Sequence, residues 1–205
     1  MSELNTTSYA ILSLLAVRPW TTYELAKQMD RSLHWFWPRA TSVLYTEPKK
    51  LVAQGLATVS RQHTGRRPRT VYQITPQGRQ ALRGWLDRPG TGPTLEFEAL
   101  VQVAFADHGT KSQLLATLAS IRQQADTRRQ EAVARAEEYA TTGGPFPERL
   151  HVIALVARFL LDYTELVATW AAWAEQQVPG WPGVAAGDGA PVAADAFQPA
   201  RPKHR

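Results

Sequence analysis

Between Tyr9 and Leu86 the sequence carries helical and strand patterns in an order that restricts the fold. The first pattern, Tyr9 to Val17, is apolar on most faces and stops at Pro19, which is typical of the central helix of a small core. The second pattern begins after Thr21, which stands three residues before Glu24 and so has the spacing of a capping box. Two helices joined by a short turn are therefore expected at the start of the chain.

A third helical pattern follows an aromatic connector and runs from about Ala40 to Gln54. Gly55 is expected to supply its left-handed C-cap. Pro48 lies inside this pattern, where proline removes one helical hydrogen bond and costs about 3 kcal/mol relative to alanine. The sequence therefore predicts a kink or break near Thr46 and Glu47, which would divide the helix into two segments.

Two short alternating stretches, residues 56–60 and 71–73, come next and predict strands. The turn between them spans Arg61 to Arg69 and combines glycine and proline with several arginines. Another helix opens at Thr75-Pro76-Gln77-Gly78 and continues to about Asp87. This order of elements predicts a winged helix-turn-helix, a fold that usually places one helix in the DNA major groove.

The charges are unevenly distributed along the 205 residues. Residues 1–94 contain 13 Lys and Arg against 5 Asp and Glu, a balance of +8, whereas residues 95–178 contain 7 against 11, a balance of −4. A basic half joined to an acidic half favours a polyanion-binding module attached to one that does not bind polyanions. Ordinary variation in surface charge is the alternative explanation.

The second half of the chain has helical patterns only. Residues 88–93 form a linker rich in proline and glycine, and helices are expected over about 95–107, 111–140 and 148–177. Pro, Gly and Ala dominate from residue 179 onward. The predicted fold class is mainly α, with an α+β winged helix-turn-helix domain over 1–88, an all-α dimerisation domain over 95–178 and a disordered tail over 179–205.

Several classes of protein are disfavoured by the sequence. The last helical pattern has the length of a membrane span, but Arg158, Asp162 and Glu165 at its middle would each cost about 2.5–3.5 kcal/mol at a bilayer centre. The chain has no cysteine, its five histidines are scattered, and no phosphate-binding loop or nucleophile elbow is present. We therefore expect a cytoplasmic protein without a membrane segment, enzymatic activity, cofactor or metal.

The candidate functional residues lie on the third helix and on the arginine-rich turn. Hydroxyls, one aromatic and cations suit base-edge and phosphate contacts, whereas a solvated helix face more often mixes Glu with Lys, and here Glu47 is the one acidic residue. A solvated basic hairpin is the alternative for the turn. The predicted DNA-binding residues are Arg39, Thr41, Ser42, Tyr45, Thr46, Lys49 and Lys50 on the helix, and Arg66, Arg67 and Arg69 on the turn.

Several motifs in the first 86 residues resemble the PadR family of bacterial transcriptional regulators. They are Ser8-Tyr9-Ala10-Ile11-Leu12-Ser13-Leu14-Leu15, Thr22-Tyr23-Glu24-Leu25, Phe36-Trp37-Pro38, Leu44-Tyr45 with Leu51 and Gly55-Leu56, and Val71-Tyr72-Gln73-Ile74-Thr75-Pro76-Gln77-Gly78. The second half is similar in architecture to the helical dimerisation part of the longer members.

The resemblance implies a homodimer that binds a short palindromic operator in double-stranded DNA and usually represses a nearby gene, with a small molecule sometimes lifting repression. It also implies a recognition helix over about Thr41 to Gln54, with Tyr45 at the family's tyrosine position, and a wing over Arg61 to Arg69. Pro48 stands where many relatives carry leucine or a similar residue.

Trp170 and Trp173 lie three residues apart on the last helix and therefore on one side of it. Such a pair most often packs in a subunit interface, and the alternative is an aromatic wall that binds a small aromatic effector. Two other functions remain open: a winged-helix module for protein interaction, and an effector-binding scaffold that has lost DNA binding. Only the DNA-binding regulator predicts a specific operator.

Overall fold

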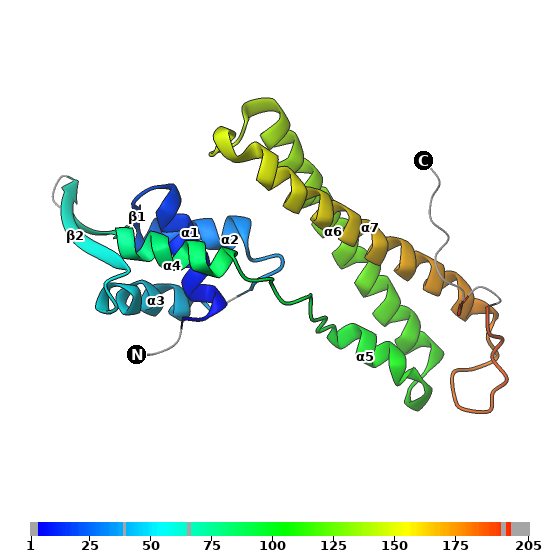
Figure 1. The fold of residues 1–205 in the computed structure, drawn as a ribbon. Coiled ribbons are helices and arrows are strands. Elements are labelled where there is room, and N and C mark those ends of the chain that lie inside the picture. Colours follow the sequence, from blue (N-terminus) through cyan, green and yellow to red (C-terminus); the bar gives the residue numbers. More distant parts are fainter. Residues whose placement is uncertain (1–3, 39, 65–66, 194–195, 198–205) are drawn as a thin grey trace. The chain divides into compact units, whose positions relative to one another are not determined.

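The computed structural model describes residues 4–38, 40–64, 67–193 and 196–197. These residues form two compact units, 1–93 and 94–205, which are described separately (Figure 1). Among the described helices, none combines the length and apolarity needed to cross a bilayer.

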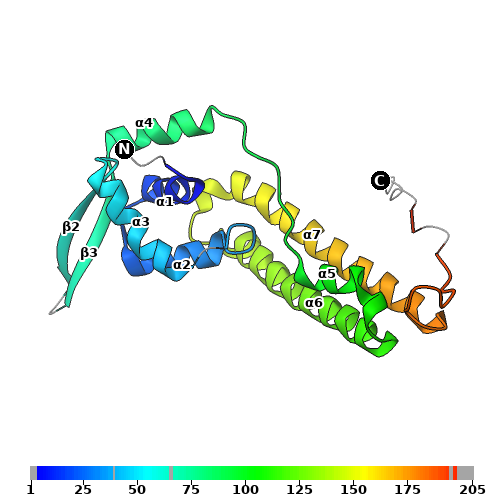
Figure 2. The same cartoon turned by 90° about the horizontal axis from the view of Figure 1, so that it is seen from below.

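The first unit contains four helices and a small antiparallel sheet among its described residues. The elements are α1 (Thr6–Val17), β1 (Trp20–Thr21), α2 (Thr22–Ser32), α3 (Thr41–Ala53), β2 (Ala57–Thr64), β3 (Arg67–Ile74) and α4 (Pro76–Leu86). The strand order is β1-β3-β2, and the β2–β3 hairpin extends beyond the helices of its unit (Figures 1 and 2). This is the predicted winged helix-turn-helix arrangement.

Helix α1 forms the centre of this unit because its apolar residues cover more than one face. Ile11, Leu12 and Leu15 are each at most 1% exposed. Asn5 begins the helix through a capping box, in which its side chain accepts from the Ser8 amide at 2.9 Å and Ser8 Oγ accepts from the Asn5 amide at 3.2 Å. Helices α3 and α4 and strand β3 all contact α1.

The predicted capping box of α2 is confirmed. The Glu24 amide donates to Thr21 Oγ1 at 3.2 Å, and the Thr21 amide donates to Glu24 Oε2 at 2.8 Å. That backbone donor lowers the pKa of the Glu24 carboxyl below its ordinary value, and the Thr21 hydroxyl and the Arg18 guanidinium act in the same direction, whereas burial opposes them. The start of α2 is therefore fixed by local hydrogen bonds.

Strand β1 was not expected from the sequence, because a two-residue strand has no detectable alternation. It exists through pairing with β3, in which Trp20 lies opposite Tyr72. Trp20 is 3% exposed, and its Nε1 donates to the Leu14 carbonyl at 2.7 Å. The aromatic ring therefore joins the sheet to the end of α1.

Four residues connect the end of α3, the base of the hairpin and the start of α4. The Leu56 amide donates to Leu51 O, which with the left-handed Gly55 forms the Schellman motif expected at this C-cap. Thr75 Oγ1 donates to Gly55 O at 2.8 Å and accepts from the Gly78 amide at 3.0 Å. A Cβ on Gly78 would lie 2.1 Å from Leu56 O, so only glycine allows this crossing. We call this group (Gly55, Leu56, Thr75 and Gly78) the hairpin junction.

The predicted break at Pro48 is wrong, because α3 is one continuous helix from Thr41 to Ala53 with Pro48 inside it. The Pro48 side chain is almost fully buried, so its packing offsets the lost helical hydrogen bond. The preceding residue, Glu47, is also buried and is bonded to α1. Tertiary contacts therefore keep α3 continuous through a position where propensity alone predicts a division into two segments.

The second unit consists of α5 (Glu98–Ala104), α6 (Lys111–Thr142), α7 (Leu150–Gln177) and the short 3-10 turns η1 (Ala106–His108), η2 (Pro147–Arg149) and η3 (Val178–Gly180). Helices α6 and α7 form an antiparallel hairpin. Ion pairs of 2.9 Å and 3.4 Å link them, Arg122–Glu175 and Arg129–Glu165.

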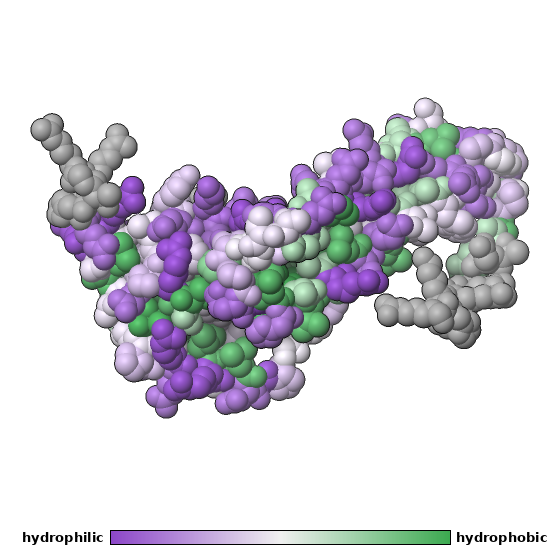
Figure 3. All heavy atoms as spheres, turned by 90° about the horizontal axis from the view of Figure 1, so that it is seen from above, coloured by the Kyte–Doolittle hydropathy of each residue, from purple (hydrophilic) through white to green (hydrophobic). Residues whose placement is uncertain are grey.

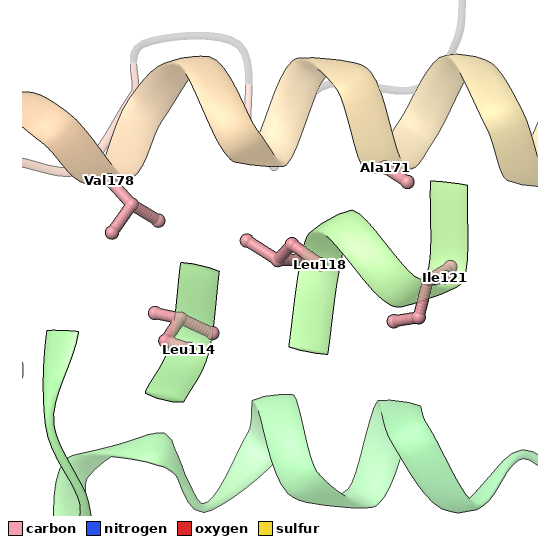
Figure 4. Packing of buried hydrophobic residues seen from close by; sticks show 5 residues of the cluster. All are labelled: Leu114, Leu118, Ile121, Ala171 and Val178. Carbon is pink, nitrogen blue, oxygen red and sulfur yellow. The ribbon is translucent and has the colours of Figure 1, made fainter. Parts of the chain in front are cut away.

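A cluster of buried side chains packs the end of this helical hairpin. Figure 4 shows the five residues of this cluster, which are Leu114, Leu118 and Ile121 of α6 together with Ala171 and Val178. All five residues are at most 5% exposed. This cluster is the hydrophobic centre of the second unit.

The sequence predicts a disordered tail from residue 179 onward, but the first residues of this segment pack against the second unit. Trp181 and Val184 pack against the buried cluster. Lys111 Nζ donates to the carbonyls of Pro179 and Trp181 at 2.7 and 2.8 Å, so an ammonium 68 residues earlier caps this turn. The basic segment 201–205 lies outside the described residues.

The lowered pKa of Glu24 predicts a specific pH dependence of stability. Its ionised form is favoured by folding, so the contribution is present above the ordinary carboxyl pKa and is lost as pH falls through the lowered folded pKa. We expect Glu24→Gln to be less stable than wild type at pH 7, with the difference shrinking below about pH 4. Urea unfolding followed by tryptophan fluorescence measures this difference. A difference in unfolding free energy between wild type and Glu24→Gln that is equal at pH 7 and pH 3 would contradict the electrostatic explanation.

Candidate nucleic-acid interface

Helix α3 presents a continuous polar stripe to solvent. Its exposed side chains recur at helical spacing and are Ser42, Tyr45, Thr46, Lys49, Lys50 and Ala53. Tyr45 is 43% exposed, although it is the one large aromatic on this stripe. The opposite side faces the core through Leu44, Leu51 and Pro48. The helix therefore separates a packing face from a face with hydroxyl, phenol and ammonium groups.

The sequence pattern placed Glu47 on the exposed face of α3, and the structure shows instead that this residue is buried. It is 4% exposed, its Oε1 accepts from Ser8 Oγ at 2.5 Å, and its Oε2 lies 3.1 Å from Lys50 Nζ. The described part of the α3 stripe consequently exposes no acidic side chain. This lack of a negative charge makes the face more suitable for an anionic partner than the sequence alone indicated.

Thr46 has part of its hydrogen-bonding capacity occupied. Its Oγ1 lies 3.2 Å from the carbonyls of both Ser42 and Val43 and donates back to the helix. The lone pairs of Oγ1 remain available to accept a hydrogen bond from a bound partner. Thr46 can therefore accept but not donate while this geometry holds.

The hairpin beside α3 carries exposed arginines. The β2–β3 register continues to the pair Thr64 and Arg67, so a connection of only two residues closes the hairpin. Arg61 pairs with Thr70 and Arg69 pairs with Gln62. Because neighbouring positions of a strand point to opposite faces, Arg61 and Arg69 lie on opposite faces of the hairpin, and both are exposed. A guanidinium is thus available on each face.

The predicted DNA-binding residues fall into two groups. Those with described side chains are all exposed: Ser42, Tyr45, Thr46, Lys49, Lys50 and Arg69. Arg39 and Arg66 lie outside the described residues, and Thr41 and Arg67 occupy the first positions of α3 and β3 with side chains outside the description. Sequence reasoning missed Ser8 as a partner of α3, since its contact with Glu47 joins residues 39 positions apart.

The two tryptophans proposed for an effector lie on α7. Trp170 packs partly against the buried cluster of its own unit, and Trp173 is half-buried. A groove of about 600 Å³ lies between α5, α6 and α7, but neither tryptophan lines it. Its wall includes Phe97, Arg128 and Tyr163.

Metal ligation finds no support in the part of the chain that the structure describes. No group of three or more His, Asp or Glu side chains is arranged there to hold an ion.

Sequence comparison relates the first unit to a family of regulators. Residues 11–84 match the model described as the transcriptional regulator PadR-like family. The chain is 31% identical over 99 residues to the negative transcriptional regulator PadR of Bacillus subtilis, a match that covers 47% of this chain and 54% of that protein. The chain spans about half the length of the curated relatives that it matches.

Structural comparison extends over more of the chain. The crystal structure of Bacillus subtilis PadR in complex with operator DNA has a TM-score of 0.74 at 21% identity, covering 85% of this chain and 99% of that one. The same protein in complex with p-coumaric acid has a TM-score of 0.68 at 20% identity, covering 86% and 99%. At such identities the likeness concerns the fold, and it confirms the predicted mainly α class with a winged helix and a helical C-terminal region.

The relatives are named as transcriptional regulators rather than enzymes, in agreement with the prediction of a non-enzymatic protein. Residues 11–84 of this chain are thus similar to the PadR-like family of transcriptional regulators.

Proposed function

We propose that this protein is a transcriptional regulator that binds a specific operator in double-stranded DNA. The observation that carries the proposal is the exposed stripe of α3, which offers Tyr45, Thr46 and Lys49 without an exposed acid, next to a hairpin with exposed arginines. In this proposal α3 enters the major groove and reads base edges, and the wing contacts phosphates. The fold likeness to PadR solved with operator DNA supports this assignment.

We propose further that the protein acts as a homodimer through α7. This helix carries a seam of aromatic and aliphatic residues that alternate at spacings of four and three: Val152, Val156, Phe159, Tyr163, Leu166, Trp170 and Trp173. Phe159 is 56% exposed and Leu166 is 65% exposed, which is costly for side chains of this size in a lone unit. Figure 3 shows one face of the molecule, on which hydrophobic residues reach the surface between hydrophilic ones.

A second copy is the proposed cover for this α7 seam because the alternating spacing is that of a coiled-coil interface. A dimer also suits a palindromic operator, since two-fold symmetry in the protein matches two-fold symmetry in the site. Trp170 and Trp173 belong to the seam, which favours their role in subunit packing over an isolated pocket.

Repression and an aromatic effector complete the proposal. The name of the Bacillus subtilis relative, a negative transcriptional regulator, supports repression. The p-coumaric acid complex of that protein supports a small aromatic compound as the effector class. Trp170 and Trp173 stay the predicted contact for such a compound, at the part of the α7 seam nearest the end of the helix.

Removal of a wing arginine tests the phosphate role. We expect Arg69→Ala to weaken binding equally for all DNA sequences and to reduce the slope of log K against log salt by about 0.9 per protomer. Arg128→Ala, which removes the same charge from the second unit, is the matched control and should leave the slope unchanged. Gel-shift titration at four salt concentrations measures both. A slope equal to wild type for Arg69→Ala would reject a phosphate contact and favour a protein-interaction role for this surface.

A charge in the α7 seam tests the dimer. We expect Phe159→Asp to convert the dimer to monomer at micromolar concentration, because a carboxylate would be buried without a partner. Ala154→Asp adds the same charge at an exposed position outside the seam and should remain dimeric. Sedimentation equilibrium gives the masses; a wild-type monomer, or a dimer in both variants, would disprove the α7 interface.

A further inference from the structure

Helix α3 holds a carboxylate beneath the surface that is proposed to bind DNA. Glu47 is 4% exposed, and its two oxygens contact Ser8 Oγ and Lys50 Nζ. Burial of a carboxylate is costly unless charge and hydrogen-bond partners compensate. Ser8, itself 1% exposed on α1, donates to one oxygen and so favours the orientation in which Glu47 faces α1. The charge of Glu47 is therefore fixed on the core side of α3.

This arrangement makes two adjacent lysines unequal. The Lys50 side chain is 57% exposed, yet its ammonium is paired with Glu47 at 3.1 Å. Lys49 is exposed and makes no ion pair with another described side chain. The interaction of Lys50 with a partly buried anion is screened less by salt than a surface pair would be. Lys50 consequently brings less net charge to the DNA-facing stripe than Lys49 does.

The position of Glu47 decides which kind of binding it affects. An exposed acid on this stripe would repel every phosphate directly, whereas a buried one acts through Lys50. If Lys50 left Glu47 for a phosphate, the carboxylate would lose its cation inside the protein, which opposes the exchange. Phosphate contacts supply nearly all sequence-independent affinity, so a withheld cation lowers that affinity in particular.

We propose that Glu47 is a specificity-determining positioning residue, which neutralises Lys50 from the core side of α3 and keeps sequence-independent DNA binding low. This inference rests on the proposed DNA-binding function. It assigns Ser8 the role of holding the carboxylate in place, and it assigns Lys49 the principal phosphate charge of α3.

A double-mutant cycle on salt dependence tests the inference. The full-length protein is titrated with a random-sequence duplex at several salt concentrations, and the slope of log K against log salt is compared among four variants. Lys49→Met should flatten the slope by about 0.9 per protomer, and Lys50→Met by less than half as much. Glu47→Gln, which keeps an acceptor for Ser8 but removes the charge, should steepen the slope by the remainder of the Lys50 contribution, which is more than half of about 0.9 per protomer, and bind the random duplex more tightly. Glu47→Gln with Lys50→Met should return to the slope of Lys50→Met.

The increase in affinity separates this role from a merely structural one. Loss of structure in α3 would weaken binding to all DNA, whereas release of Lys50 strengthens binding to random sequence and lowers the ratio of specific to non-specific affinity. Circular dichroism and thermal unfolding establish that each variant is folded. If Glu47→Gln does not fold, the salt slopes of Lys49→Met and Lys50→Met still show whether Lys50 contributes less charge to DNA binding than Lys49 does.

The contradicting results are distinct. Equal flattening by Lys49→Met and Lys50→Met would overturn the inference while leaving DNA binding intact, as would a folded Glu47→Gln with the wild-type slope. Absence of any salt-dependent binding by the wild-type protein would overturn the proposed function together with this inference.

Discussion

The functional geometry of the first unit depends on the hairpin junction. Gly55 and Leu56 lie between the end of α3 and the start of β2, Thr75 lies between β3 and α4, and Gly78 of α4 packs against Leu56 O. The contact between Gly78 and Leu56 O leaves no space for a Cβ, so the elements cannot shift independently. The exposed stripe of α3 and the β2–β3 hairpin are held relative to one another because α3, β2 and β3 all end at this junction.

A second constraint acts on α3 from the other side. Glu47 and Pro48 are both buried, and Ser8 bonds the carboxylate to α1. The helix is thus anchored at its middle by α1 and at its end by the hairpin junction. Such anchoring leaves the exposed stripe preorganised for a partner, which reduces the cost of ordering on binding.

Much of the first unit could be predicted because its signals are local. The capping box of Thr21 and Glu24, the left-handed Gly55 and the Thr75 cap each depend on residues within a few positions. The two strands and the basic hairpin follow from alternation and turn chemistry.

What could not be predicted depends on contacts between distant residues. The pairing of β1 with β3 joins Trp20 to Tyr72, and the burial of Glu47 depends on Ser8. Pro48 is tolerated in a continuous helix because tertiary packing outweighs its propensity. The η3 turn after α7 is held by Lys111, far earlier in the chain, and Trp181 and Val184 pack against the second unit although their segment has the composition of a disordered tail. The site residues at the hairpin tip lie outside the described residues, so their roles rest on the sequence.

The proposed function requires two copies of α3 to read one specific palindromic site. Selection of bound duplexes from a random pool by the purified wild-type protein measures whether they do. We expect enrichment of two inverted half-sites whose centres are about one helical turn apart, or a multiple of it, as a dimer of winged helices requires. Recovery of a pool without any enriched sequence, at a salt concentration where the protein is folded, would contradict it.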